Sequence, residues 1–175
     1  GKNFICFPSC EESIPNGILN NDKRVVVDEN IITSKAAGTT FDFAYEIVKN
    51  LLWGKKTDDE LYDLMWNNQK DVLKGCETNV LVMADTSGSM TCYEGIPLAT
   101  SIGLALYTAE RNTGIFKNHF ITFSNKPYLC EIKGKTIKDK VKNIPTIVAN
   151  TNIDAAFELI LKTAKKNKIK QEVKI

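Results

Sequence analysis

Residues 80–89 have the sequence VLVMADTSGS, in which an apolar run passes directly into a polar loop. The apolar run, residues 80–84, shows no alternation of polar and apolar side chains. A strand of this kind has both faces buried, as in the centre of a parallel sheet. Ligands of open α/β sheets bind beyond the carboxyl ends of the strands, which is where Asp85 lies. This stretch therefore predicts both a sheet and the position of a site.

The segments that follow the apolar run are predicted as alternating helices and strands. They are a helix at 96–111, strands at 120–123 and 128–132, and helices at 136–143 and 152–167. The turn residues 124–127 join the two strands as an antiparallel hairpin at the edge of the sheet. This order predicts an α/β fold with a doubly wound, mostly parallel open sheet and one antiparallel edge strand.

The residues before the apolar run predict two helices and a less regular beginning. Residues 41–53 form one helix that ends at Gly54, and a second helix runs from Thr57 to Gly75. Residues 1–40 form an unassigned N-terminal segment with a strand candidate at 25–27. The predicted buried face of helix 41–53 carries Ala44, Ile47, Val48 and Leu51. That of helix 57–75 carries Leu61, Leu64, Met65, Trp66 and Val72. That of helix 96–111 carries Ala99, Ile102, Leu106 and Ala109.

Length and composition indicate one soluble globular domain. The chain has 175 residues, of which 43% are hydrophobic and 25% charged, and its net charge is +2. So small a net charge does not favour nucleic acid or a membrane as partner. No apolar run is long enough to span a bilayer, and no basic-then-apolar leader opens the sequence. Five scattered cysteines favour reduced thiols over a disulfide framework, so we expect a cytoplasmic protein.

The loop after the apolar run collects oxygen donors. Asp85, Ser87 and Ser89 follow one another at alternate positions, and Gly88 allows a tight turn without a Cβ clash. One carboxylate and two hydroxyls suit Mg²⁺, with Mn²⁺ or Ca²⁺ also possible. Thr151 precedes the last helix at a second loop-to-helix junction. It is a fourth candidate ligand, although it could equally cap that helix.

Enzyme motifs do not fit the same residues, and we expect no catalytic activity. A haloacid-dehalogenase-type phosphatase needs a second acid where Ser87 stands. A serine-hydrolase elbow needs a glycine where Asp85 stands. His119 is the sole histidine, so neither a catalytic triad nor a histidine-rich metal site is available. Cys6 and Cys10 have no second Cys/His pair to complete a zinc site.

Asp85-Thr86-Ser87-Gly88-Ser89-Met90 resembles the Asp-x-Ser-Gly-Ser-Met signature of von Willebrand factor A domains, which occur in integrins, chelatase subunits and the Ro ribonucleoprotein. Segments 82–90, 120–127 and 150–161 are similar to a viral and cellular family of uncharacterised proteins with a Ro-like A domain. The resemblance covers residues 41–175. It implies a metal-ion-dependent adhesion site in which Asp85, Ser87, Ser89 and Thr151 hold the ion.

The resemblance also implies a departure and a function. In that family a second acidic residue follows the next strand, in a Ser-Asp step, but here the sequence stops inside that strand. We therefore expect an A domain that is incomplete at its C-terminus. The expected function is cation-dependent capture of an exposed Asp or Glu on a protein partner. The alternatives are an RNA-associated, Ro-like component, which the charge does not support, and a structural remnant with a vestigial ion site.

Overall fold

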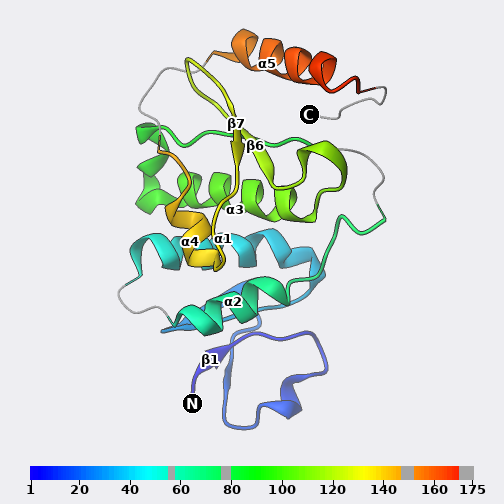
Figure 1. Ribbon diagram of the computed structural model, residues 1–175. Coiled ribbons are helices and arrows are strands. Elements are labelled where there is room, and N and C mark those ends of the chain that lie inside the picture. The colour runs from blue at the N-terminus through cyan, green and yellow to red at the C-terminus, as the bar shows by residue number, and fades with distance from the viewer. Residues whose placement is uncertain (55–57, 76–79, 147–151, 170–175) are drawn as a thin grey trace.

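The computed structural model describes residues 1–54, 58–75, 80–146 and 152–169 (Figure 1). Its helices are α1 (Thr40–Trp53), α2 (Asp59–Asn67), α3 (Ile96–Arg111), α4 (Ile137–Lys142) and α5 (Ile153–Lys166). Its strands are β1 (Asn3–Phe4), β2 (Ile18–Leu19), β3 (Val25–Asp28), β4 (Ile31–Ser34), β5 (Met83–Ala84), β6 (His119–Thr122) and β7 (Leu129–Glu131). The α/β class is confirmed as a mixed fold with small sheets. No helix in the described ranges is long and apolar enough to cross a membrane.

The sheet that carries the apolar run has the strand order β5-β6-β7. β5 and β6 are parallel, with Met83 opposite Ile121, whereas β6 and β7 form the predicted antiparallel hairpin. β7 is therefore the predicted antiparallel edge strand. β5 is shorter than the predicted strand at 80–84, because within the described residues only Met83 and Ala84 have register partners in β6.

Both faces of this sheet are covered, as the unbroken apolar run predicts. Phe120 and Ala84 belong to the core on the α3 side, whereas Ile121 packs with Leu81 and with Ile160 of α5. Neighbouring residues of one strand point to opposite faces, so each face receives its own helix. Figure 1 shows this layering, with α5 on one side of β6 and β7 and α3 on the other.

Helix α3 is buried between the sheet and α1. Its predicted inward residues, Ala99, Ile102, Leu106 and Ala109, are all buried. α1 packs closely on α3, since a Cβ at Gly103 would lie 3.5 Å from the backbone nitrogen of Tyr45, an ordinary van der Waals distance. The helix that follows the candidate loop is thus held rigidly on two sides.

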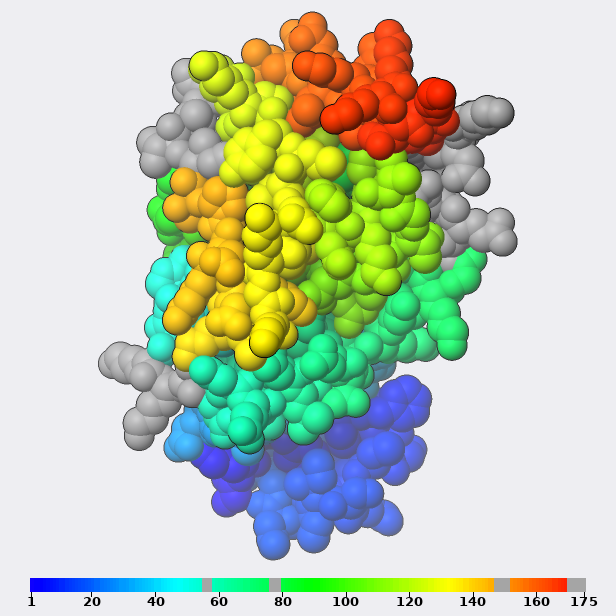
Figure 2. Space-filling model, in the orientation of Figure 1, coloured from blue at the N-terminus to red at the C-terminus, as the bar shows by residue number. Residues whose placement is uncertain are grey.

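The N-terminal segment packs against the far side of α1. The strand candidate at 25–27 is confirmed as part of β3, which pairs with β4 in an antiparallel hairpin. Ile32 of β4 belongs to the same core as α1, and the Asp28 carboxylate accepts a hydrogen bond from the Asn3 backbone. In the space-filling view this segment forms one end of the molecule and α5 the other (Figure 2).

The prediction for α2 is wrong in its limits and in part of its buried face. The N-cap is Asp58, which accepts a hydrogen bond from the Leu61 nitrogen, and the helix ends at Asn67 rather than near Gly75. Trp66 lies in the core as predicted, but Leu64 is 60% exposed. The inward face is instead Tyr62 and Trp66, because Trp66 donates its indole hydrogen bond to Glu110 of α3.

Gly95, directly before α3, provides a test of how the fold positions the loop. Its φ is +77°, and a Cβ there would lie 2.3 Å from the Trp53 ring. We expect Gly95→Ala to lower the free energy of unfolding by about 1–2 kcal/mol, because L-residues are strained at positive φ. Urea unfolding followed by fluorescence measures the change. Gly38→Ala is the control, since a Cβ there meets nothing within 4 Å. If both variants lost the same free energy of unfolding, the left-handed backbone of Gly95 would not be a constraint on the fold.

Candidate functional site

The candidate loop begins where two parallel strands end together. Asp85 follows β5, and the Phe123 nitrogen, just beyond β6, donates a 2.9 Å hydrogen bond to the Ala84 carbonyl. Buried Ser124 therefore lies past the end of β6 at the same edge of the sheet. This is the edge at which open α/β sheets bind ligands.

The Asp85 carboxylate is fixed by its own loop. Its Oδ1 accepts a 2.9 Å hydrogen bond from the Ser87 nitrogen. No described residue donates a hydrogen bond to the other oxygen, Oδ2. Asp85 is partly buried, so its position is constrained while one oxygen stays available.

Ser87 and Ser89 lie side by side. Their hydroxyl oxygens are 2.9 Å apart, at the start of a 3-10 turn, η3 (Gly88–Thr91). The loop thus brings two of the predicted ligands, the serine hydroxyls, into contact, while the Asp85 carboxylate contacts the backbone of Ser87. The predicted role of Gly88 is wrong, however, because a Cβ there would meet nothing within 4 Å.

Thr151, the fourth predicted ligand, lies outside the described residues. Its alternative role as the cap of the last helix is wrong, because Asn152 occupies the N-cap of α5. The Asn152 side chain accepts a 3.0 Å hydrogen bond from the Ala155 nitrogen. An asparagine side chain reaches the first-turn N–H groups as well as a threonine does, and it stands one residue nearer the helix.

Thr86, to which sequence patterns assign no role, anchors the loop. Its side chain is buried, and its hydroxyl donates a 2.8 Å hydrogen bond to the Pro145 carbonyl. This bond places the segment after α4 beside the loop. A signal was present, because Thr86 lies two residues after buried Ala84, and side chains two residues apart on an extended chain share a face.

The far end of the loop has an uncommon backbone. Cys92 donates to the Ser89 carbonyl and Gly95 to the Cys92 carbonyl, so tight turns connect the serines to α3. Tyr93, Glu94 and Gly95 all have positive φ, at 49°, 57° and 77°. Left-handed backbone costs an L-residue about 1–2 kcal/mol, so the loop holds Tyr93 and Glu94 against a local preference.

The donors of this loop define what it can bind. A carboxylate and two hydroxyls are hard oxygen ligands, suited to Mg²⁺, Mn²⁺ or Ca²⁺. Across the described residues no three His, Cys, Asp or Glu side chains gather into a metal cluster. The loop therefore differs from carboxylate-rich and histidine-rich centres, and a cation here would keep most of its positive charge.

Other reactive side chains of the described chain lie apart from the loop. His119 opens β6, and its Nδ1 lies 2.7 Å from the Lys117 carbonyl, so it has a local structural partner. Four cysteines, Cys6, Cys10, Cys92 and Cys130, are free thiols, and Cys76 is outside the described residues. Burial raises the pKa of the Cys6 and Cys130 thiols, which keeps both protonated at neutral pH.

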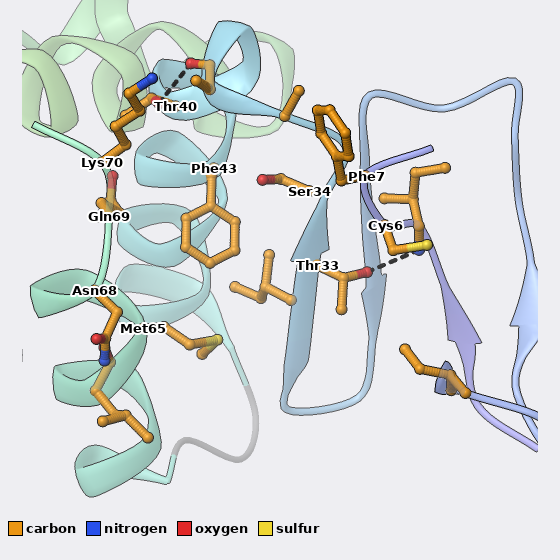
Figure 3. Close-up of a pocket in the computed structure, with 16 residues that line it drawn as sticks. Cys6, Phe7, Thr33, Ser34, Thr40, Phe43, Met65, Asn68, Gln69 and Lys70 are labelled. Carbon is orange, nitrogen blue, oxygen red and sulfur yellow. Dashed lines mark hydrogen bonds between the residues drawn. The ribbon is translucent and has the colours of Figure 1, made fainter. Parts of the chain in front are cut away.

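A hollow of about 560 Å³ lies between the N-terminal segment and helices α1 and α2. Figure 3 shows Phe43 and Met65 on one side of it, and Thr33 and Cys6 on the other. This lining is mainly apolar. Its polar lining residues are hydroxyls, amides and Lys70, with no carboxylate among them, so we place the candidate cation site at the Asp85 loop.

One comparison with known proteins covers the part of the chain that contains this loop. A family model described as a domain of unknown function (DUF7788) matches residues 79–175, more than half of the chain. The chain therefore belongs to this family.

Individual relatives match shorter parts. Uncharacterized protein L728 of Acanthamoeba polyphaga mimivirus is 31% identical over 116 residues, which is 64% of this chain and 20% of that protein. Protein DJ-1alpha of Drosophila melanogaster is 44% identical over 46 residues, which is 26% of this chain and 21% of that protein. Protein dj-1beta of the same organism is 35% identical over 60 residues, which is 34% of this chain and 32% of that protein. The chain thus spans about a fifth of the viral relative. No solved structure matches it.

Thr86→Val tests the anchor of the loop. Valine keeps the shape but leaves the Pro145 carbonyl without its donor, so the free energy of unfolding should fall by about 1–2 kcal/mol. Thr91→Val is the matched control, because Thr91 is exposed and its hydroxyl also bonds a loop carbonyl, that of Gly88. The control should stay within about 0.5 kcal/mol of the parent in urea unfolding. If Thr91→Val lowered the free energy of unfolding as much as Thr86→Val does, burial of the Thr86 hydrogen bond would not explain its contribution to stability.

Proposed function

We propose that the chain is a divalent-cation-dependent binding module, and that Asp85, Ser87 and Ser89 hold Mg²⁺ or a similar cation. The observation that carries the proposal is the contact of the two serine hydroxyls, whose oxygens are 2.9 Å apart, in the loop that follows β5 and begins with Asp85. Asp85 Oδ2 has no donor among the described residues, so an oxygen is available to the ion. The covered faces of the sheet favour the doubly wound, von Willebrand factor A-like arrangement that the loop motif resembles.

The chemistry of the loop also favours a particular kind of partner. Its single carboxylate neutralises only part of a divalent charge, and magnesium sites commonly keep several waters. A carboxylate from a protein partner could replace such a water. The proposed partner is therefore a protein with an exposed Asp or Glu. Thr151 remains a proposed fourth ligand, and no catalytic step is proposed.

Asp85→Asn tests the cation site. Asparagine keeps an oxygen that can accept the Ser87 hydrogen bond, so the loop should keep its shape while losing the charge that attracts a cation. Calorimetric titration of the parent with MgCl₂ or MnCl₂ should show weak binding, with a Kd on the order of a millimolar, as for cation sites with few charged ligands.

In the same titration Asp85→Asn should give no measurable heat. Asp22→Asn is the control, since Asp22 is exposed in the N-terminal segment. It should behave as the parent does. Equal heats from Asp85→Asn and the parent would overturn the proposed site.

Ser87→Ala and Ser89→Ala separate metal contact from folding. Both serines lie in a surface loop, so each variant should keep its thermal midpoint and change the free energy of unfolding by no more than about 0.5 kcal/mol. Each should also weaken the cation titration, because it removes one hydroxyl ligand. If either variant melts well below the parent, the serine that it replaces has a structural role instead.

A further inference from the structure

Helix α5 has a row of large apolar side chains that its own packing leaves uncovered. The inward face of the helix is formed by Ala156 and Ile160, which are both buried. Ile153, Phe157 and Leu161 are instead 57%, 50% and 54% exposed. Side chains four residues apart on a helix are neighbours on its surface, so these three form one continuous row. We name Ile153, Phe157 and Leu161 the α5 stripe.

The stripe belongs to a helix that another molecule can reach. In the space-filling view α5 forms one end of the molecule, opposite the N-terminal segment (Figure 2). Single exposed apolar residues are ordinary on a protein surface, whereas contiguous apolar patches mark sites of interaction. The stripe is therefore a candidate interface, and the charges beside it indicate what fits there.

Charged side chains on α5 are divided by sign along the helix. Its N-terminal half carries Asp154 and Glu158, and its C-terminal half carries Lys162 and Lys165. All four are exposed, and none of them forms an ion pair with another described residue. This division suits the dipole of the helix. It also makes the helix complementary to a second α5 that runs in the opposite direction, whereas a parallel copy would place like charges together.

One antiparallel register satisfies the stripe and the charges together. When Phe157 is placed opposite Leu161 of a second copy, Asp154 lies within one residue, or about 1.5 Å of helix rise, of the level of Lys165 of that copy. Asp154 and Lys165 also lie on the same side of the stripe, because the residues between them complete about three whole turns. A two-fold axis between antiparallel helices brings this side of one copy to the same side of the other.

A membrane surface fits the stripe less well than a second copy does. Helices that bind anionic membranes carry lysines and arginines along their polar face. Asp154 and Glu158 would instead be repelled by anionic lipid headgroups. A second copy of the chain turns the same two carboxylates into favourable contacts.

We propose that the α5 stripe is a homodimer interface, in which α5 of one copy packs antiparallel against α5 of a second copy around a two-fold axis. Phe157 and Leu161 form the apolar centre of this interface. Asp154 and Lys165 form an ion pair that occurs twice, once on each side of the axis. This dimer requires no bound cation, so it is independent of the proposed site at Asp85.

Sedimentation equilibrium of the 175-residue chain tests the dimer. The buffer contains EDTA, so that no divalent cation can bridge two copies. We expect a reversible monomer–dimer equilibrium with a Kd on the order of tens of micromolar, because a single pair of helices buries less surface than a standard interface. A chain that stays monomeric at tenfold higher concentration overturns the proposal. Monomeric binding to phosphatidylserine vesicles would assign the stripe to a membrane and overturn it as well.

Leu161→Gln removes an apolar side chain from the centre of the interface. Glutamine is a good helix former, so α5 should persist in circular dichroism. The dimer should dissociate at least tenfold more readily, as expected when a central contact is lost. Leu64→Gln is the matched control, because Leu64 is 60% exposed on α2 and should leave the Kd unchanged. Equal effects of the two changes would place the contact elsewhere and overturn the proposal.

A charge exchange tests the antiparallel direction. Lys165→Glu and Asp154→Lys each replace both ion pairs by repulsive contacts, so each variant alone should dimerise about tenfold more weakly than the parent. An equimolar mixture of the two variants should form a heterodimer at about the parent affinity, because every facing pair is again of opposite sign. Recovery in the mixture also shows that both variants are folded. Single variants that dimerise as the parent does, or a mixture that stays monomeric, overturn the antiparallel pairing.

Discussion

The parallel pairing of β5 with β6 is the constraint on which the rest of the structure depends. Two backbone hydrogen bonds, from Ile121 to Val82 and from Phe123 to Ala84, set the register. That register turns Phe120 toward α3 and Ile121 toward α5, so one pairing decides what both faces of the sheet bury. It also brings the ends of the two strands to one edge, where Asp85 begins the loop. A slip of one residue would exchange the two faces and dismantle both cores.

Much of this arrangement could be predicted because it follows from local patterns. The unbroken apolar run at 80–84 predicted a sheet with two buried faces, and helical periodicity predicted α3 with its buried residues. The limits of α2 could not be predicted in the same way. Leu64 fits a helical stripe as well as Trp66 does, and only contacts with Glu110 and α4 turn Tyr62 and Trp66 inward. Such contacts join residues far apart in sequence, and periodicity carries no information about them.

In the candidate site too, the features that depend on neighbouring residues could be predicted, and those that depend on distant contacts could not. The closeness of Ser87 and Ser89 could be predicted, because the two residues are only two positions apart in one short loop. The anchor of Thr86 on Pro145 could not, since the two lie far apart in the chain. The left-handed run at Tyr93 and Glu94 was also hidden, because neither residue type favours it; only Gly95 is a residue that such a turn would ordinarily use. The parts of the site that local preference opposes are those that sequence patterns do not reveal.

The hydrogen bond from Thr86 to Pro145 has a consequence for the order of folding. It joins residues 59 positions apart, whereas the β5–α3–β6 unit closes over a shorter stretch of chain. Because loop-closure entropy grows with the length of the loop, the shorter unit is expected to form first. The loop would then receive its anchor only when α4 and its following segment dock. An emerging chain would therefore form the sheet before the loop that begins at Asp85 is anchored, and this loop would reach its final position late in folding.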